Sequence, residues 1–161
     1  MIYIKNRDTT DKGRLSDSTI GTGKYFEPSE TGVAISDANA ITSFDSDGFT
    51  LGTGANGMND NTEDFAAWCW ITDTTDAKQN VLHWTGTGAA QNVAHGLGVT
   101  PDFFWGKSMA AANGHKINHV ALSDRSAKAL DISIAADDLI SAFTMLVIVL
   151  LSELIVLLVM V

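Results

Sequence analysis

Turn-forming residues divide most of this chain into short apolar runs, and this spacing constrains the fold more than any other feature. Gly, Asp, Asn, Ser and Thr are abundant up to about residue 136, and no glycine follows Gly114. Short apolar runs between such clusters are typical of β-strands, whereas amphipathic helical periodicity is hard to find before about Ser126. The pattern therefore predicts an all-β fold, an antiparallel sandwich-like domain. The strands are expected at residues 2–5, 41–44, 49–51, 65–71, 81–85, 103–107 and 117–122.

The run from Asp64 to Ile71 is the strongest strand signal. Phe65 and Cys69 would point to one side of this strand and Trp68 and Trp70 to the other, so both faces are apolar. A strand of this kind is expected at the centre of a sheet and covered on both faces. The four Trp residues would then supply much of the core, and Cys69 would be a packed, inert thiol.

Length and charge exclude several classes of protein. The 161 residues allow about one domain of ordinary size. With 19 acidic and 10 basic residues, the formal charge of −9 opposes binding to a nucleic acid. A single cysteine cannot form an internal disulfide or a cysteine-based zinc site.

The end of the chain differs from the rest, because residues 139–161 are apolar and carry one charge, Glu153. A helix of this length would span a bilayer. However, Glu153 lies within the apolar run, and Asp137 and Asp138 precede it in place of Lys or Arg. We therefore keep two interpretations of this tail, a helical transmembrane anchor and the product of a frame-shift.

Two glycine-rich segments resemble phosphate-binding loops without meeting their requirements. Residues 52–57 fit G-x-G-x-x-G, but no apolar-striped helix follows to receive a pyrophosphate. Residues 21–24 lack the first glycine and the final hydroxyl residue of a phosphate loop. Both segments are interpreted as turns, and no cofactor or cofactor-binding residue is expected.

From the positions of the titratable residues we likewise assign no catalytic residue and no metal ligand. His115 and His119 are four residues apart on a predicted strand, about 13 Å from each other and too far to share an ion. Burial would raise the pKa of the Cys69 thiol and so prevent it from acting as a nucleophile with His83 or His95. Oxygen-rich turns leave calcium as an open question at Asp45, Asp47 and Asp60, although such turns occur commonly without an ion.

The chain also contains a weak internal repeat. Residues 2–5 resemble residues 104–107, and residues 48–51 resemble residues 142–145. This order predicts a first β-rich unit over 1–100 that is truncated at its N-terminus, the start of a second unit over 101–138, and the apolar tail over 139–161.

An ordered series of short motifs carries a resemblance to a known type of domain. The motifs are Ile4-Lys5-Asn6-Arg7, residues 15–18, 23–25, 37–39 and 42–52, Ala67-Trp68-Cys69-Trp70, and residues 84–88 and 95–101. Together they resemble an uncharacterised repeat domain of marine bacteriophage tail-fibre and virion structural proteins. The resemblance implies a β-rich virion component with no catalytic residues.

The expected function is thus a non-enzymatic phage virion structural module, in a tail fibre or on the virion surface. Its partners would be other virion proteins or copies of itself, with a contribution to host attachment through cell-surface glycans, and no nucleic acid. One alternative is a membrane-anchored β domain held by residues 139–161 as a transmembrane helix. Another is a carbohydrate-active or carbohydrate-binding domain, which as a glycosidase would need two carboxylates about 5 to 10 Å apart in one cleft.

Overall fold

The computed structural model describes residues 1–54, 57–76, 79–121 and 130–132. Within them the chain forms strands and no helix, which confirms the predicted all-β fold. The strands are β1 (Ile2–Asn6), β2 (Arg14–Ser16), β3 (Lys24–Tyr25), β4 (Ile35–Ser36), β5 (Ile41–Asp45), β6 (Gly48–Leu51), β7 (Phe65–Cys69), β8 (Phe103–Gly106), β9 (His115–His119) and β10 (Leu130–Ile132).

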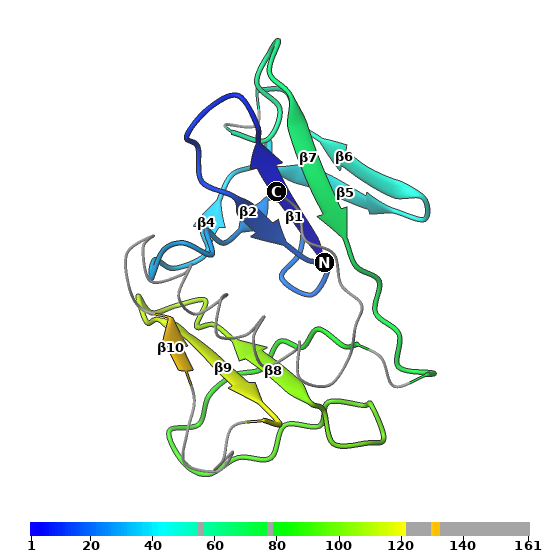
Figure 1. The fold of residues 1–161 in the computed structure, drawn as a ribbon, viewed down its shortest axis with the longest axis vertical. Helices are drawn as coiled ribbons and strands as arrows, with labels where there is room; N and C mark the ends of the chain where they lie inside the picture. The colour runs from blue at the N-terminus through cyan, green and yellow to red at the C-terminus, as the bar shows by residue number, and fades with distance from the viewer. Residues whose placement is uncertain (55–56, 77–78, 122–129, 133–161) are drawn as a thin grey trace.

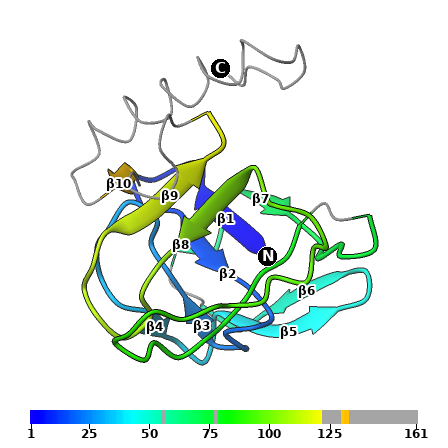
Figure 2. The ribbon, with the colours of Figure 1, turned by 90° about the horizontal axis from the view of Figure 1, so that it is seen from below.

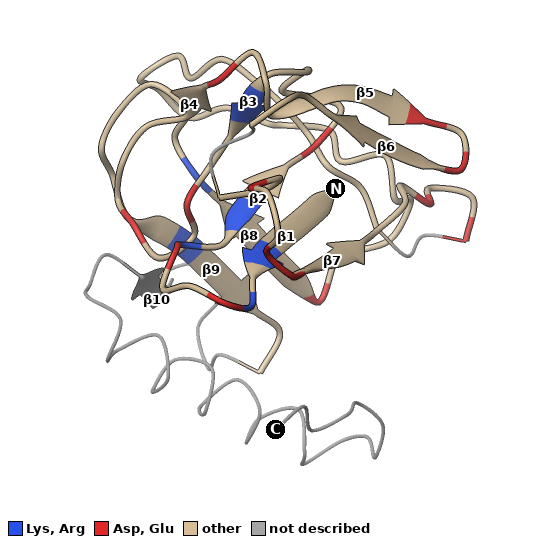
Figure 3. Ribbon diagram, turned by 90° about the horizontal axis from the view of Figure 1, so that it is seen from above, with Lys and Arg blue, Asp and Glu red and all other residues tan. Residues whose placement is uncertain are grey.

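The strands form small antiparallel sheets. One three-stranded sheet has the order β2-β1-β7 and another has the order β10-β9-β8, while β3 pairs with β4 and β5 pairs with β6. Figure 1 shows the β2–β1–β7 sheet in blue and green and the β8–β9–β10 sheet in yellow-green to orange at the opposite end of the molecule. Most Asp and Glu residues lie in the loops that connect the strands (Figure 3).

The hydrophobic core lies against β1. Burial alternates along this strand, so that Ile2 and Ile4 face inward while Tyr3 and Lys5 are only half-buried. The buried cluster consists of Ile2, Ile4, Tyr25, Ala40, Ile41 and Met58, and residues of β4, β5, β6 and β7 pack around it. The core is therefore enclosed between the β2–β1–β7 sheet and the β5–β6 hairpin, which Figure 2 shows from below.

The central position predicted for β7 is wrong, because among the described strands β7 lies at the edge of its sheet and pairs with β1 alone. Trp68 is half-buried and forms a cross-strand aromatic pair with Tyr3, with ring centroids 5.5 Å apart. Cys69 is exposed and Trp70 is 41% exposed. Aliphatic residues fill the space predicted for the indoles, since the inward face of β1 already packs against Ile41 and Met58. Apolar residues on both faces of a strand indicate packing on both faces, but they do not require that large aromatic rings be fully buried.

Most other predicted strands are present, with shifted ends. Residues 81–85 form no strand, and β9 begins at His115, two residues before the predicted start, while Leu122 lies outside the described residues. The short strands β2, β3 and β4 were not predicted, because two or three residues are too few to show an alternating pattern.

The segment from Glu27 to Ala34, between β3 and β4, is joined by hydrogen bonds to β9 and to the loop between β8 and β9. Lys107 Nζ donates to the Thr31 carbonyl at 2.9 Å, and Ala34 N donates to the Met109 carbonyl at 3.1 Å. The nitrogen Nε2 of His115 lies 3.2 Å from the Glu30 carbonyl oxygen. These bonds hold the turn between β8 and β9 against the first part of the chain.

Several predictions concern residues that the structure does not describe. The apolar tail over 139–161 and the repeat motif at 142–145 both lie outside the described residues. Within the described part of the chain, no helix has the length and apolar character needed to cross a bilayer. The boundary near residue 100 stays a prediction.

Candidate functional site

A groove of about 810 Å³ lies on the described residues and is wide enough to hold a ligand. It runs between the side of the β2–β1–β7 sheet and the strands β8 and β9. We call it the aromatic groove, because two Trp and two Phe side chains contribute to its walls. Its lining is Met1, Leu15, Asp17, Ile20, Phe26 and residues 81–86, 104–110 and 113–116.

Trp105 of β8 is fixed in the groove by a buried histidine. Trp105 Nε1 donates a hydrogen bond to His115 Nδ1 at 2.9 Å, and His115 is 2% exposed. An indole N–H can only donate, so Nδ1 must accept and Nε2 carries the hydrogen that points to the Glu30 carbonyl. The neutral histidine thus bridges Trp105 to the first part of the chain, and the indole ring keeps one orientation although it is 37% exposed.

Trp84 enters the groove from a segment without strand pairing. Its side chain is 42% exposed, while the neighbouring Val81 and Leu82 are half-buried. Asn80 Nδ2 donates to the His95 carbonyl at 2.8 Å and ties the start of this segment to a later loop. The predicted strand at 81–85 is therefore replaced by an extended wall of the groove.

The charged groups Asp17 and Lys107 are already occupied within the protein. Asp17 Oδ1 accepts hydrogen bonds from the backbone N of Thr19 at 2.7 Å and of Ile20 at 3.3 Å. Lys107 Nζ donates to three backbone carbonyls, those of Thr31, Ser108 and Asn113, at 2.8 to 3.2 Å. Burial lowers the pKa of Lys107 below its ordinary value. Neither group offers a free charge to a ligand.

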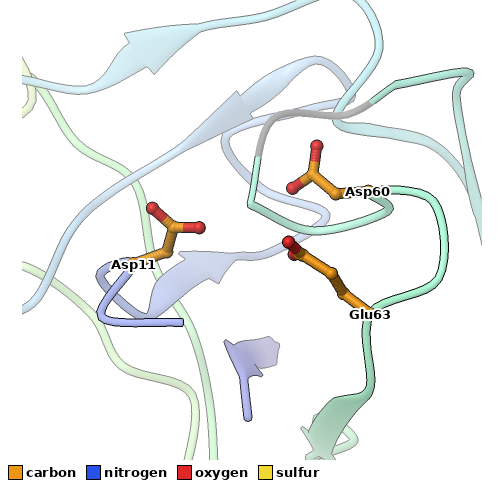
Figure 4. A group of neighbouring side chains, drawn as sticks. All are labelled: Asp11, Asp60 and Glu63. Atoms are coloured by element: carbon orange, nitrogen blue, oxygen red, sulfur yellow. The ribbon is translucent and has the colours of Figure 1, made fainter. Parts of the chain in front are cut away.

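A second candidate is a cluster of three carboxylates, Asp11, Asp60 and Glu63, which we call the carboxylate cluster. One oxygen from each lies within 4.8 Å of the others (Figure 4). Asp11 comes from the loop after β1, and the other two come from the loop before β7. Oxygen ligands of this kind suit Ca²⁺, but they supply three of the six to eight ligands that the ion takes.

Neutral donors hold the carboxylate cluster together. The buried Asn6 donates through Nδ2 to Glu63 Oε2 at 2.5 Å and to Asp11 Oδ2 at 3.5 Å. The backbone N of Gly57 donates to Asp60 Oδ2 at 2.5 Å. Lys12 forms ion pairs with Glu27 and Glu30, and Arg14 forms one with Glu27, and these glutamates lie outside the cluster.

Comparison with known proteins places the chain in a family. Residues 1–147 match the family described as a domain of unknown function, DUF7483. The chain belongs to the DUF7483 family. No curated protein and no solved structure matches it significantly. The DUF7483 match spans both three-stranded sheets, so the aromatic groove and the carboxylate cluster both lie inside the domain.

Among the predicted calcium candidates of this DUF7483 chain, only Asp60 belongs to the carboxylate cluster. Asp45 accepts hydrogen bonds from Ser43 Oγ at 2.5 Å and Thr50 Oγ1 at 3.0 Å, which stabilise the β5–β6 hairpin. Asp47 lies exposed in the turn of the same hairpin. Asp11 was missed, because it is far from Asp60 in sequence and has no motif around it.

His115 and His119 of the DUF7483 domain lie on one strand, as predicted, and have different partners. His115 and His119 both belong to β9; His115 contacts Trp105, and His119 Nδ1 accepts from the backbone N of Ala121 at 3.1 Å. His95 Nδ1 accepts from the backbone N of Leu97 at 3.2 Å. The predicted burial of Cys69 is wrong, since the thiol is exposed at the end of an edge strand.

The described glycines of the two glycine-rich segments lie in or beside turns, as predicted. Gly21, Gly23, Gly54 and Gly57 have positive φ values between 62° and 86°. Such dihedrals are typical of tight turns, and no helix begins within the described residues. They provide no row of backbone N–H groups at a helix N-terminus for a phosphate.

Among the described residues, few carboxylates lie at the aromatic groove. Asp17 is the one acidic residue in the described lining of the aromatic groove. The three carboxylates that do lie close together belong to the carboxylate cluster and do not line the groove. The described lining of the groove thus holds no pair of carboxylates of the kind that glycosidases use.

Proposed function

We propose that this DUF7483 domain is a non-enzymatic structural module of a phage virion, located in a tail fibre or on the virion surface. It acts by assembly with copies of itself or with other virion proteins, and it contributes to contact with host-surface glycans. The resemblance of its ordered motifs to phage structural proteins supports virion proteins as its partners. The formal charge of −9 favours protein partners over nucleic acid.

The observation that carries the assembly role is the amount of apolar surface left exposed beside a small core. The buried cluster has six residues, whereas the exposed large apolar side chains are Val33, Trp70, Ile71, Trp84, Val99, Phe103, Phe104, Trp105 and Val120. Isolated exposed apolar residues are ordinary, but contiguous ones mark surfaces that a partner covers.

Strand β8 concentrates this exposure at a sheet edge. Phe103, Phe104 and Trp105 are consecutive and 37 to 44% exposed, and β8 is the last strand of its sheet. A Cβ atom added to Gly106 would lie 2.9 Å from the Phe104 ring, so the ring covers the strand backbone at that position. An apolar edge strand of this kind is a template for pairing with another chain.

Two measurements test the proposal. Phage particles from a host that carries the gene are probed with antibodies raised against the recombinant chain, and the expected result is labelling of tail or surface structures. Analytical ultracentrifugation is expected to show concentration-dependent self-association that Phe103→Thr weakens. Ile71→Thr serves as the matched control, because Ile71 is 81% exposed and follows β7 instead of β8. Absence of the chain from purified particles would contradict the virion role.

A further inference from the structure

We infer that the aromatic groove binds a neutral oligosaccharide, with Trp84 and Trp105 as the platforms on which sugar rings stack. The inference rests on the proposed function and deepens it, because it names the site and the chemical class of the ligand. The volume of about 810 Å³ falls within the range of roughly 300 to 1,000 Å³ found for small-molecule sites.

The first argument is that Trp105 is oriented before any ligand arrives. The bond from its N–H to His115 uses the only polar atom of the indole, so what remains for a ligand is the apolar ring surface. The His115 imidazole is buried and also bonded to the Glu30 carbonyl, so its own position is fixed. The bond to this fixed imidazole keeps the Trp105 indole from turning into the core. A partly exposed indole held in this way loses little conformational entropy on binding.

The second argument concerns the chemistry of the walls. A sugar ring presents a face of C–H groups that packs on an indole and a rim of hydroxyls that require hydrogen bonds. The groove offers two indoles together with the exposed imidazole of His83, the hydroxyl of Thr85 and the amide of Asn113. Aromatic area beside a few neutral polar groups is the combination that binds uncharged, hydroxylated ligands.

The third argument is electrostatic and selects a neutral ligand over an acidic one. Asp17 is bonded to the backbone of its own turn, and Lys107 gives its donors to three backbone carbonyls. The net charge of −9 further opposes an anionic glycan at long range. Lys116 is an exposed cation of the lining, and comparing the affinity for neutral glycans with that for sialylated glycans measures its contribution to binding.

The experiment uses the full chain on an array of cello-, malto- and laminari-oligosaccharides and of galactose- and N-acetylglucosamine-terminated glycans, beside their sialylated counterparts. The best neutral glycan is then titrated while Trp fluorescence is recorded. We expect Trp84→Ala to weaken binding about five- to tenfold. Trp105→Phe, which keeps a ring but loses the bond to His115, should weaken it less. Trp70→Ala is the matched control, because Trp70 is 41% exposed and does not line the groove.

Three results would overturn the inference. The first is that a chain shown by circular dichroism to be folded binds no neutral glycan. The second is a preference for sialylated glycans. The third is an equal loss of glycan affinity in Trp84→Ala and Trp70→Ala. The proposed function fails separately: a chain present in virions without glycan binding refutes the groove site alone. A chain that binds glycans through Trp84 but is absent from virions refutes the virion role alone.

Discussion

Replacing Ile4 by Ala tests whether the fold is built on β1. Ile4 is 2% exposed on the central strand and belongs to the buried cluster with Ile41 and Met58. The substitution removes three buried carbon atoms, and Ile→Ala in a core costs about 2 to 5 kcal/mol in the free energy of unfolding. That is a large part of the roughly 5 to 15 kcal/mol that stabilises an ordinary domain. At about 2 to 4 °C per kcal/mol for a chain of this size, the melting temperature should fall by roughly 4 to 20 °C.

The assay is urea unfolding followed by circular dichroism, with two comparison variants on or beside β7. Trp68→Ala removes a half-buried ring whose described aromatic partner is Tyr3, so we expect a smaller loss than for Ile4→Ala despite the larger deletion. Ile71→Ala alters a residue that is 81% exposed and should change the free energy of unfolding by no more than about 0.5 kcal/mol. A larger loss for Trp68→Ala than for Ile4→Ala would mean that β7 is the central strand and would refute the reasoning.

Three further substitutions give expected outcomes. Lys107→Met removes the amine whose pKa burial lowers. In the natural protein the lowered pKa means that, as pH approaches the ordinary lysine pKa of about 10.4, the folded state binds fewer protons than the unfolded state. The free energy of unfolding of the natural protein, relative to that of Lys107→Met, should therefore increase as pH rises. Chemical unfolding at several pH values measures this difference. Asp11→Asn keeps an oxygen acceptor but removes one of three negative charges within 4.8 Å, so it should raise the melting temperature, and the gain should shrink as NaCl is added. An unchanged melting temperature at low salt would show that these charges do not repel one another. Gly57→Ala should be much more destabilising than Gly54→Ala in thermal unfolding: both glycines have φ near 65°, but only at Gly57 would the new Cβ lie 1.9 Å from Arg14 Nη1. Equal losses would show that the Arg14 side chain moves aside freely.

The all-β class could be predicted because it depends on local patterns. The apolar runs that became β1, β5, β6 and β8 are each bounded by residues that favour turns, and the alternation of Ile2, Tyr3 and Ile4 appears directly in their burial. Strand pairing is another matter, since β1 pairs with β7 across more than fifty residues of intervening chain. No local signal states which of two apolar strands will be flanked on both sides.

The misplaced core shows what hydrophobicity alone leaves open. Trp68, Trp70 and Cys69 form the most apolar strand signal, yet the space that they were expected to fill is occupied by Ile41 and Met58. Met58 was not a candidate at all, because it lies in a polar, glycine-rich turn and is nonetheless 1% exposed. An isolated apolar residue in a loop has no periodicity to reveal it, whereas an aromatic strand at a sheet edge shows full periodicity without being enclosed.

The aromatic groove could not be predicted for the same reason, and its construction explains why its aromatic residues stay exposed. Its walls come from the N-terminal residue, β2, the segment 81–86 and the turn after β8, which only the assembled fold brings together. The bond between Trp105 and His115 joins neighbouring strands, but the bond from His115 to Glu30 joins β9 to the loop between β3 and β4. Trp105 is thus oriented by a contact that also fixes the second sheet against the first part of the chain. Loosening that contact should change the groove and the packing of the sheets together, so binding at Trp105 and stability are expected to be coupled in this domain.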